Sequence, residues 1–251
     1  MRIPGFDSLL KSVEMPELPD DLDRKRVGRL LRAARSVRDM SPRIERISGR
    51  LLGHPYRDCP LGGSAGTPEI FTASMGGFDC VTYVETVLAL AASGSVEDFA
   101  ENLRSIRYRD GVVEWRTRNH YMTAWIRENE RAGFVSNQTR GRGVLLRDRR
   151  LNVVPGVPDR KVRVASIPKS AFLRRWADVE TGDLAFFAST RRNLDVFHCG
   201  ILIREGDTIR MRHAARSRRR VVEEPLSDFL DRNRMVGVIL VRPEEAFSRA
   251  A

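Results

Sequence analysis

The sequence predicts an α+β protein in which helices come first and an antiparallel sheet follows. Apolar residues recur at helical spacing in several segments of the first half, each bounded by capping and breaking residues. Apolar and charged residues alternate in the last third, where residues 204–207 have the composition of a hairpin turn. We therefore expect N-terminal helices packed on a C-terminal antiparallel sheet.

Composition and charge narrow the classes of function. The chain has 251 residues, of which 41% are hydrophobic and 31% charged, and its formal net charge is +11. No apolar run is long enough to cross a membrane, and residues 1–7 have no apolar signal core. The densest basic run, 140–150, lacks the aromatic residues that stack on nucleic acid bases. We therefore favour attraction to anionic envelope polymers over binding to nucleic acid.

Cysteine usage argues against a framework of disulfides. Cys59, Cys80 and Cys199 are an odd and small number. No Cys-x-x-Cys pair is present, which argues against a structural zinc site. We expect no cofactor and no metal ion.

The N-terminal region divides into a lead-in and two helices. Residues 1–19 contain three prolines and predict an irregular lead-in, followed by a helix at about 22–38 that is capped by Asp20 and Asp21. Ser41 and Pro42 open a second helix. We expect residues 1–40 to form a lead-in and helix, and residues 41–245 to form the main domain.

The central helix begins at Cys80. Gly76 and Gly77 permit a tight entry, Asp79 is a good N-cap, and the residues from Val81 onward are apolar or good helix formers up to a stop at 93–94. Unpaired N–H groups and the helix dipole favour an anion at this position, which lowers the pKa of a thiol. The sequence fits a nucleophile here and also fits a buried structural cysteine.

The middle of the chain carries further helices and an arginine-rich insert. Helices are expected at 96–107, at about 118–126 and at 170–177, and the insert near 136–165 is expected to form short strands or an exposed excursion. His54 and Cys59 lie in a turn-rich loop, and His120 precedes an apolar helical segment. We interpret the first two as loop residues; His120 fits either a cleft position or a hydrogen bond near a helix end.

The sequence of the C-terminal third predicts several strands. They are expected at 184–188, 195–203, 208–214 and 236–241, with a short helix at 225–232. Side chains alternate across a strand, so His198 lies on the face opposite Cys199, which we expect in the core. The hairpin makes the second and third strands antiparallel neighbours, and His213 then falls on the same face as His198.

These residues could act together. If the central helix packs against the face with the two histidines, Cys80, His198 and His213 lie in a row. His198 would then take the thiol proton, His213 would orient His198, and the backbone N–H of Cys80 would stabilise an oxyanion. A cysteine with two histidines is also compatible with a zinc site or with three unrelated core residues.

At these residues the sequence resembles the bacterial N-acetylmuramoyl-L-alanine amidase-like family, a domain of unknown function and a branch of the NlpC-type papain-like cysteine hydrolases. The resemblance covers about residues 40–243. Its strongest pieces are residues 78–85, 197–202 and 212–214. Weaker pieces lie at 52–56, 118–121, Trp125 and 237–243.

The resemblance implies a papain-like α+β fold and cleavage of amide bonds in peptidoglycan or muropeptides. It implies that Cys80 is the nucleophile, His198 the base and His213 the third polar residue. Glu85 also matches a family position, and we expect a structural hydrogen bond there. The family implies a periplasmic or extracellular location, whereas the lack of a visible signal peptide leaves the cytoplasm open.

Two functions from different classes follow. The first is a cysteine-dependent amidase or peptidase that cleaves the N-acetylmuramoyl-L-alanine bond or a stem-peptide bond through an acyl-enzyme. The second is a catalytically inactive envelope-binding module of the same fold, which would use the positive surface to hold anionic polymer.

Overall fold

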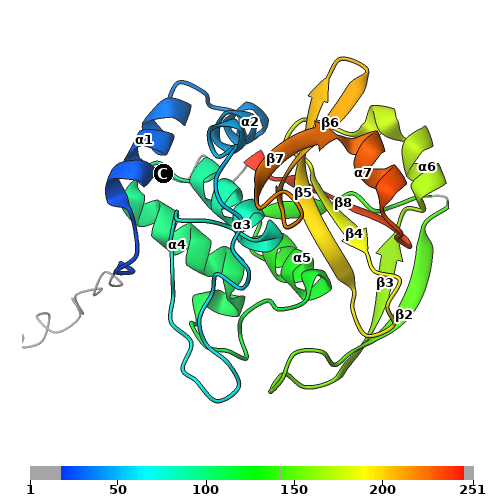
Figure 1. Cartoon of the computed structure of the whole chain (residues 1–251), viewed down its shortest axis with the longest axis horizontal. Helices are drawn as coiled ribbons and strands as arrows, with labels where there is room; N and C mark the ends of the chain where they lie inside the picture. The colour runs from blue at the N-terminus through cyan, green and yellow to red at the C-terminus, as the bar shows by residue number, and fades with distance from the viewer. Residues whose placement is uncertain (1–17, 142, 246–251) are drawn as a thin grey trace, which may run out of the picture.

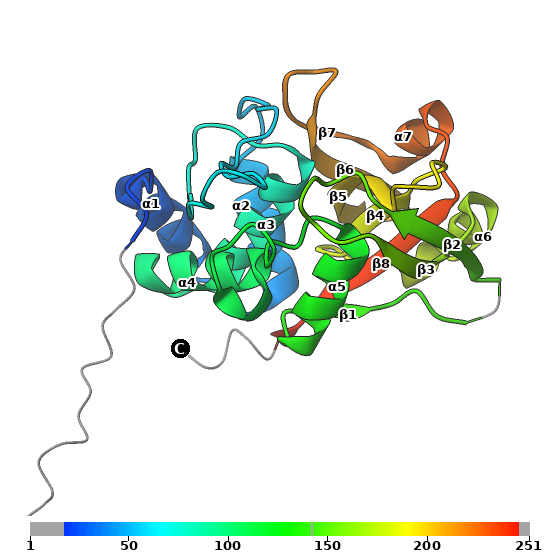
Figure 2. The same ribbon diagram turned by 90° about the horizontal axis from the view of Figure 1, so that it is seen from below.

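The computed structural model describes residues 18–141 and 143–245. Its helices lie on both sides of a central sheet, with α1 to α5 on one side and α6 and α7 on the other (Figures 1 and 2). The helices are α1 (Arg24–Ala34), α2 (Met40–Arg50), α3 (Cys80–Ala91), α4 (Val96–Arg107), α5 (Met122–Arg131), α6 (Lys169–Arg174) and α7 (Leu226–Arg232). Short 3-10 turns occupy Arg109–Gly111 and Trp176–Asp178. None of the helices in the described ranges has both the length and the apolar content needed to span a bilayer.

The main sheet has six strands in the order β1-β8-β4-β5-β6-β7, and every neighbouring pair is antiparallel. Its strands are β1 (Val135–Asn137), β4 (Leu184–Ala188), β5 (Val196–Glu205), β6 (Thr208–Ala215), β7 (Arg220–Pro225) and β8 (Gly237–Pro243). The expected α+β architecture with an antiparallel sheet is confirmed. The hairpin of β5 and β6 pairs Leu202 with Met211, as its short turn requires.

The arginine-rich insert forms a separate two-stranded sheet. β2 (Leu145–Leu151) and β3 (Arg160–Ser166) pair along their whole length. Ile167 follows β3 and bridges to Val238 of β8, which fixes this hairpin to the main sheet. Short strands were one of the two forms expected for this segment.

The alternation of side chains along the sheet separates two apolar clusters. One cluster joins α1 to α5 to the face that carries Cys199, Ile201 and Ile203. The other joins α6 and α7 to the face that carries Leu202 and Met211. Both faces of the sheet are therefore covered, and the neighbouring strands β4 and β8 are apolar at nearly every position.

Helix boundaries differ from expectation where capping residues decide them. α1 begins at Arg24 because the Asp23 side chain, rather than Asp20 or Asp21, accepts the N–H of Arg26. α4 occupies the expected residues and starts with a capping box. α5 begins later than expected, at Met122. Residues 1–17 of the expected lead-in lie outside the described residues.

Candidate active site

α3 begins at Cys80, as expected. The Asp79 side chain accepts the N–H of Thr82, and the Thr82 hydroxyl accepts the N–H of Asp79, which forms a capping box. A Cβ at Gly77 would lie 2.9 Å from the carbonyl oxygen of Pro55, so this close entry requires glycine. The cap leaves the N–H of Cys80 at the helix start without a partner among the described residues. A half-buried thiol therefore lies beside an unused backbone donor.

Cys199 lies under Cys80. Its side chain is buried, as expected for a core residue, and its thiol donates to the carbonyl oxygen of Cys80 at 3.3 Å. The sequence analysis assigned Cys199 only to the core. The alternation of side chains along a strand predicts which face a residue occupies, but not which side chain packs against it.

The sequence analysis made the row of three side chains conditional on packing of the central helix against the two-histidine face, and this condition is not met. α3 shares its apolar cluster with Cys199, and so it lies on the face opposite His198. The Cys80 thiol nevertheless lies close enough to His198 for the charge and hydrogen bonding of His198 to lower the pKa of the thiol. Cys80 is the first residue of its helix and His198 is near the start of β5, so the two side chains meet at the end of the sheet.

A β-bulge places His198. Phe187 of β4 pairs with His198 whereas the next residue, Ala188, pairs with Val196, so Phe197 is an extra residue in β5. Val196 packs in the cluster on the α3 side, and Phe197 packs in the cluster on the α7 side. Simple alternation would put Val196 and His198 on one face, and the bulge separates them. A bulge of this kind re-aims a side chain at a strand end.

His198, His213, Glu224 and Arg232 form a hydrogen-bonded chain. His198 Nε2 lies 2.6 Å from His213 Nδ1, and His213 Nε2 lies 2.9 Å from Glu224 Oε1. The other carboxylate oxygen of Glu224 pairs with Arg232 of α7. A carboxylate accepts hydrogen bonds, so it fixes the proton of His213 on Nε2 and leaves Nδ1 to accept from His198. The chain thus leaves Nδ1 of His198 available to the Cys80 thiol.

The pKa values fit this arrangement. Hydrogen bonding from the Cys199 thiol, and then the charge and hydrogen bond of His198, hold the pKa of Cys80 well below its usual value against the effect of burial. The same contact raises the pKa of the Cys199 thiol well above its usual value. Burial, and then the charge of His198, lower the pKa of His213 to about 4, so His213 is neutral at pH 7. The site can therefore hold a thiolate at Cys80 next to an imidazole.

Aromatic rings hold the imidazoles in place. The ring of His198 stacks on Phe229 of α7, with 5.3 Å between centroids, and on Phe187 of β4. His213 meets Phe229 edge to face. These contacts restrict the rotation of both imidazoles.

A cleft of about 480 Å³ opens beside the imidazoles. Its lining includes His198, His213, Glu224, Phe229 and Arg232. Sequence reasoning missed Glu224 and Arg232. Residues 220–225 show no clear alternation, and only the pairing of β7 with β6 places Glu224 diagonal to His213.

Two further residues adjoin the thiol. Tyr56 bridges to Phe78, and burial, and then the charge of Cys80, raise the pKa of Tyr56 to about 12. Burial, and then the charge of Cys80, raise the pKa of the capping Asp79 to about 6. The Tyr56 hydroxyl therefore remains protonated at pH 7.

The remaining candidates from the sequence lie outside this chain of contacts. Cys59 is exposed in its loop, and His54 receives a hydrogen bond from Arg26. His120 lies 2.6 Å from the carbonyl oxygen of Trp115, just before α5, which matches the expected hydrogen bond near a helix end. Glu85 forms the expected structural contact, as a buried ion pair with Arg107.

The donor set gives no site for a metal ion within residues 18–141 and 143–245. No three His, Cys, Asp or Glu side chains in these ranges group closely enough to hold one. Cys80, His198 and His213 are arranged in a row rather than around a common centre: the charge of His198 acts on the Cys80 thiol, and His198 is hydrogen-bonded to His213.

A family model described as AmiA-like, N-acetylmuramoyl-L-alanine amidase-like, matches residues 46–238. The matched range includes Cys80, His198, His213 and Glu224. No curated protein matches the chain.

Solved structures show the same fold. A Legionella pneumophila protein superposes with a TM-score of 0.78 at 21% identity, covering 88% of this chain and 94% of that one. An N-acetylmuramoyl-L-alanine amidase from Bacteroides uniformis superposes with a TM-score of 0.69 at 23% identity, covering 85% of this chain and 99% of that one. A Bacteroides fragilis protein described provisionally as a xylanase superposes with a TM-score of 0.63 at 23% identity, covering 78% and 98%. At identities of 21% and 23%, the similarity to these solved structures concerns the fold alone.

Proposed function

This chain belongs to the N-acetylmuramoyl-L-alanine amidase-like family, and from that premise we propose that it is a cysteine hydrolase that cleaves an amide bond of bacterial peptidoglycan. The bond is the N-acetylmuramoyl-L-alanine bond or one within the stem peptide. The observation that carries the proposal is that the Cys80 thiol lies close enough to His198 for the charge of His198 to lower its pKa, while His198 Nε2 is hydrogen-bonded to His213. A thiol, a base and an orienting group in that order are what nucleophilic amide hydrolysis needs.

In the proposed reaction the Cys80 thiolate attacks the carbonyl carbon of the amide, and His198 holds the proton that the thiol has lost. The oxyanion that forms accepts a hydrogen bond from the free N–H of Cys80. His198 then protonates the leaving amine, and the C–N bond breaks to leave a thioester on Cys80. Water, deprotonated by His198, hydrolyses the thioester and releases the carboxylate and the thiol.

His213 has a supporting role in this proposal. It is neutral and its Nδ1 accepts from His198, so it orients the base without taking the substrate proton. We also propose that the arrangement is the NlpC-type papain-like one. In support, the cysteine begins a helix that packs on an antiparallel sheet, and the histidines come from two neighbouring strands.

Mass spectrometry of purified peptidoglycan after incubation with the protein tests the proposal. Wild type should release new amine and carboxyl ends, which identify the bond, and Cys80→Ala should release none. Cys59→Ala is the matched control, because it removes an exposed thiol outside the site and should retain full activity. His198→Ala should lose nearly as much activity as Cys80→Ala.

Two results would reject the proposal. One is substantial hydrolysis by Cys80→Ala, which would show that another group attacks the amide. The other is the absence of products from wild type on sacculi and on soluble muropeptides alike, provided that wild type is folded by circular dichroism.

A further inference from the structure

The β2–β3 arm, meaning residues 145–166, carries a cluster of positive charge outside the candidate active site. It holds six basic and two acidic residues. Arg150 donates its N–H to the carbonyl oxygen of Arg192 at 3.1 Å, and the Arg149 guanidinium donates to the carbonyl oxygen of Ser189 at 2.9 Å. These bonds fasten the arm to the β4–β5 loop, so Arg192 joins the basic surface of the arm.

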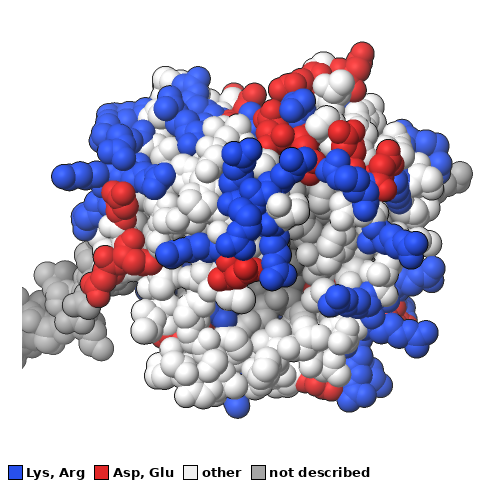
Figure 3. Space-filling model, in the orientation of Figure 1, with Lys and Arg blue, Asp and Glu red and all other residues white. Residues whose placement is uncertain are grey.

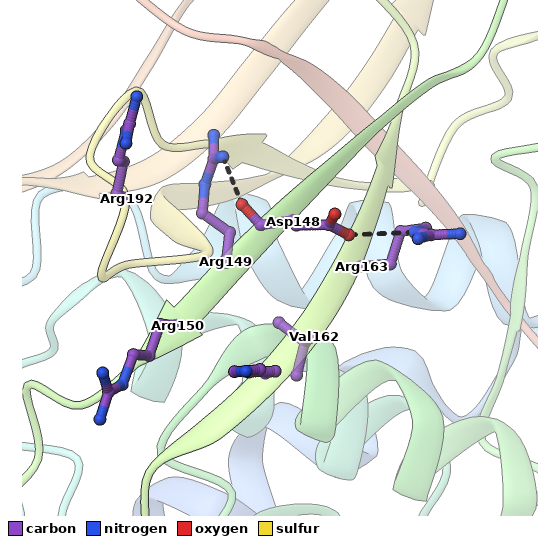
Figure 4. Close-up of a pocket in the computed structure, with 7 residues that line it drawn as sticks. Asp148, Arg149, Arg150, Val162, Arg163 and Arg192 are labelled. Atoms are coloured by element: carbon purple, nitrogen blue, oxygen red, sulfur yellow. Dashed lines mark hydrogen bonds and ion pairs between the residues drawn. The ribbon is translucent and has the colours of Figure 1, made fainter.

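The arm and loop enclose a groove of about 650 Å³ (Figure 4). Five basic side chains and one acidic side chain line it together with Val162. These are Arg149, Arg150, Lys161, Arg163 and Arg192 with Asp148. Figure 3 shows Lys and Arg side chains along the side of the molecule where Figure 1 draws β2 and β3.

Much of this positive charge has no acidic partner. Asp148 pairs with Arg163 at 3.0 Å, and Asp159 pairs with Arg150 at 2.8 Å. Lys161 and Arg192 are exposed and pair with no carboxylate among the described residues. The Nε of Arg149 is buried and has no hydrogen-bond acceptor there. The groove thus offers cationic donors that its own acidic residues do not satisfy.

The register of the arm places like charges opposite each other. Arg150 pairs directly with Lys161 across the two strands. Like charges at such positions destabilise a strand pair, and Asp159 offsets only one of the two. An anion bound between the two side chains would relieve this repulsion.

The dimensions of the arm point to an extended ligand. A strand of seven residues such as β2 spans roughly 20 Å. One small ion cannot contact cations spread over that length, whereas a chain with repeated negative charges can. Residues 145–166 include no Phe, Tyr or Trp, so the arm has no ring on which a nucleic acid base could stack.

We infer that the β2–β3 groove binds a linear envelope polymer that carries repeated phosphodiester or carboxylate groups and no bases. The guanidinium fork matches the oxygens of both groups in bidentate fashion. The inference rests on the proposed function, in which the enzyme acts at the cell wall. Holding such a polymer would keep the enzyme at the wall and raise its effective concentration there.

The test measures binding of poly(glycerol phosphate) to the full chain with the Cys80→Ala substitution, which separates binding from turnover. Lys161→Glu with Arg192→Glu should weaken binding at least tenfold and reduce the slope of log K against log salt by about 2, since each lost phosphate contact removes about 0.9 or less. The pair Lys161→Gln with Arg192→Gln should weaken binding less, in the same direction. Lys25→Glu with Arg29→Glu on α1 is the matched control, because both residues are exposed and the net charge changes equally.

The outcomes separate the alternatives. Binding of poly(glycerol phosphate) but not poly-L-glutamate identifies a phosphodiester polymer, the reverse identifies a carboxylate polymer, and binding of both supports the shared chemistry. Equal losses from the arm pair and the α1 pair would overturn the inference, since overall charge would then explain binding. Tighter binding to single-stranded DNA than to either polymer would also overturn it. Peptidoglycan hydrolysis by wild type is scored separately, so the failure of one proposal does not hide the other.

Discussion

The thiol of Cys199 donates a hydrogen bond to the carbonyl oxygen of Cys80, with 3.3 Å between the sulfur and the oxygen. Its hydrogen bond to the Cys80 side chain is also the largest effect that lowers the pKa of Cys80. A residue in the middle of a strand thus stabilises the thiolate at the start of a helix. The pH dependence of the alkylation rate of Cys80 should therefore change when Cys199 is replaced.

Cys199→Ala should slow the alkylation of Cys80 at neutral pH by roughly tenfold or more. The variant removes a hydrogen bond to a charged group, which is worth about 1.5–3 kcal/mol, and 1.36 kcal/mol corresponds to a factor of ten. The rate of reaction with iodoacetamide is measured from pH 5 to 9 by peptide mass spectrometry. The measurement uses a Cys59→Ser background, so that the exposed thiol does not consume the reagent.

Cys199→Ser is the control for this prediction. A hydroxyl is also a donor, so it should restore most of the alkylation rate. If Cys199→Ala reacts at the wild-type rate across the whole pH range, Cys199 has only a packing role.

Glu224→Ala should lower kcat for peptidoglycan hydrolysis by about tenfold and change KM little. The carboxylate accepts from His213 Nε2 and so determines which nitrogen of His213 faces His198. Loss of one charge-assisted hydrogen bond of about 1.5 kcal/mol gives a change of this size. The loss should be smaller than that of Cys80→Ala, because the thiol and His198 remain in place. The pH profile of kcat should also shift.

The neighbouring Glu223 provides the control. It pairs with Arg210 and Arg212 on the other side of β7 and does not contact the imidazoles. Glu223→Gln should leave the pH profile of kcat as in wild type. Identical pH profiles of kcat for Glu224→Ala and wild type would show that Glu224 does not orient His213 during the reaction.

The parts of the site that depend on local sequence were predictable. Asp79 and the apolar run after Cys80 specify the start of α3 within a few residues, and the structure begins the helix there. The tight turn after β5 fixes the pairing with β6, and so the shared face of His198 and His213 followed from alternation.

The parts that depend on distant pairing were not predictable. The bulge at Phe197 lies where β4 changes register against β5 while it keeps a continuous register against β8. No residue near Phe197 predicts this shift. Alternation also left open which face of the sheet receives α3, since both faces are apolar. Glu224 reaches His213 only after β7 pairs with β6, and residues 220–225 are too short and too charged to read as a strand alone.

Wild type should lose stability as the pH falls from about 6.5 to 4 because of His213. The pKa of an unfolded histidine is about 6.5, and burial lowers the pKa of His213 to about 4 in the folded protein. Between these values the unfolded state binds more protons, so the free energy of unfolding falls with falling pH. The contribution reaches up to about 3 kcal/mol at pH 4.

His213→Gln isolates this effect, because glutamine keeps a polar side chain that does not titrate. The pKa of Asp79 is raised to about 6, which gives a slope of the opposite sign in both proteins and cancels in the comparison. Urea unfolding at pH 7 and pH 4 gives the two free energies. The advantage of wild type over the variant should shrink on going to pH 4; a constant difference would contradict the lowered pKa.

Glu85→Ala should destabilise the protein by about 3–5 kcal/mol. Glu85 Oε2 accepts from Arg107 at 2.8 Å, Oε1 accepts from Trp125 at 3.2 Å, and both charged side chains are 3% exposed. Removing one partner leaves a buried charge without compensation, which is the costly case. Urea unfolding measures the loss.

The double variant Glu85→Leu with Arg107→Leu distinguishes a structural pair from a catalytic one. Replacing both charges by apolar side chains leaves no buried charge, so the double variant should be more stable than Glu85→Ala. The folded fraction of each variant should keep a wild-type kcat, because Glu85 contacts Arg107 and Trp125 rather than the imidazoles. A variant that is as stable as wild type and has lost kcat would instead assign Glu85 a part in the reaction.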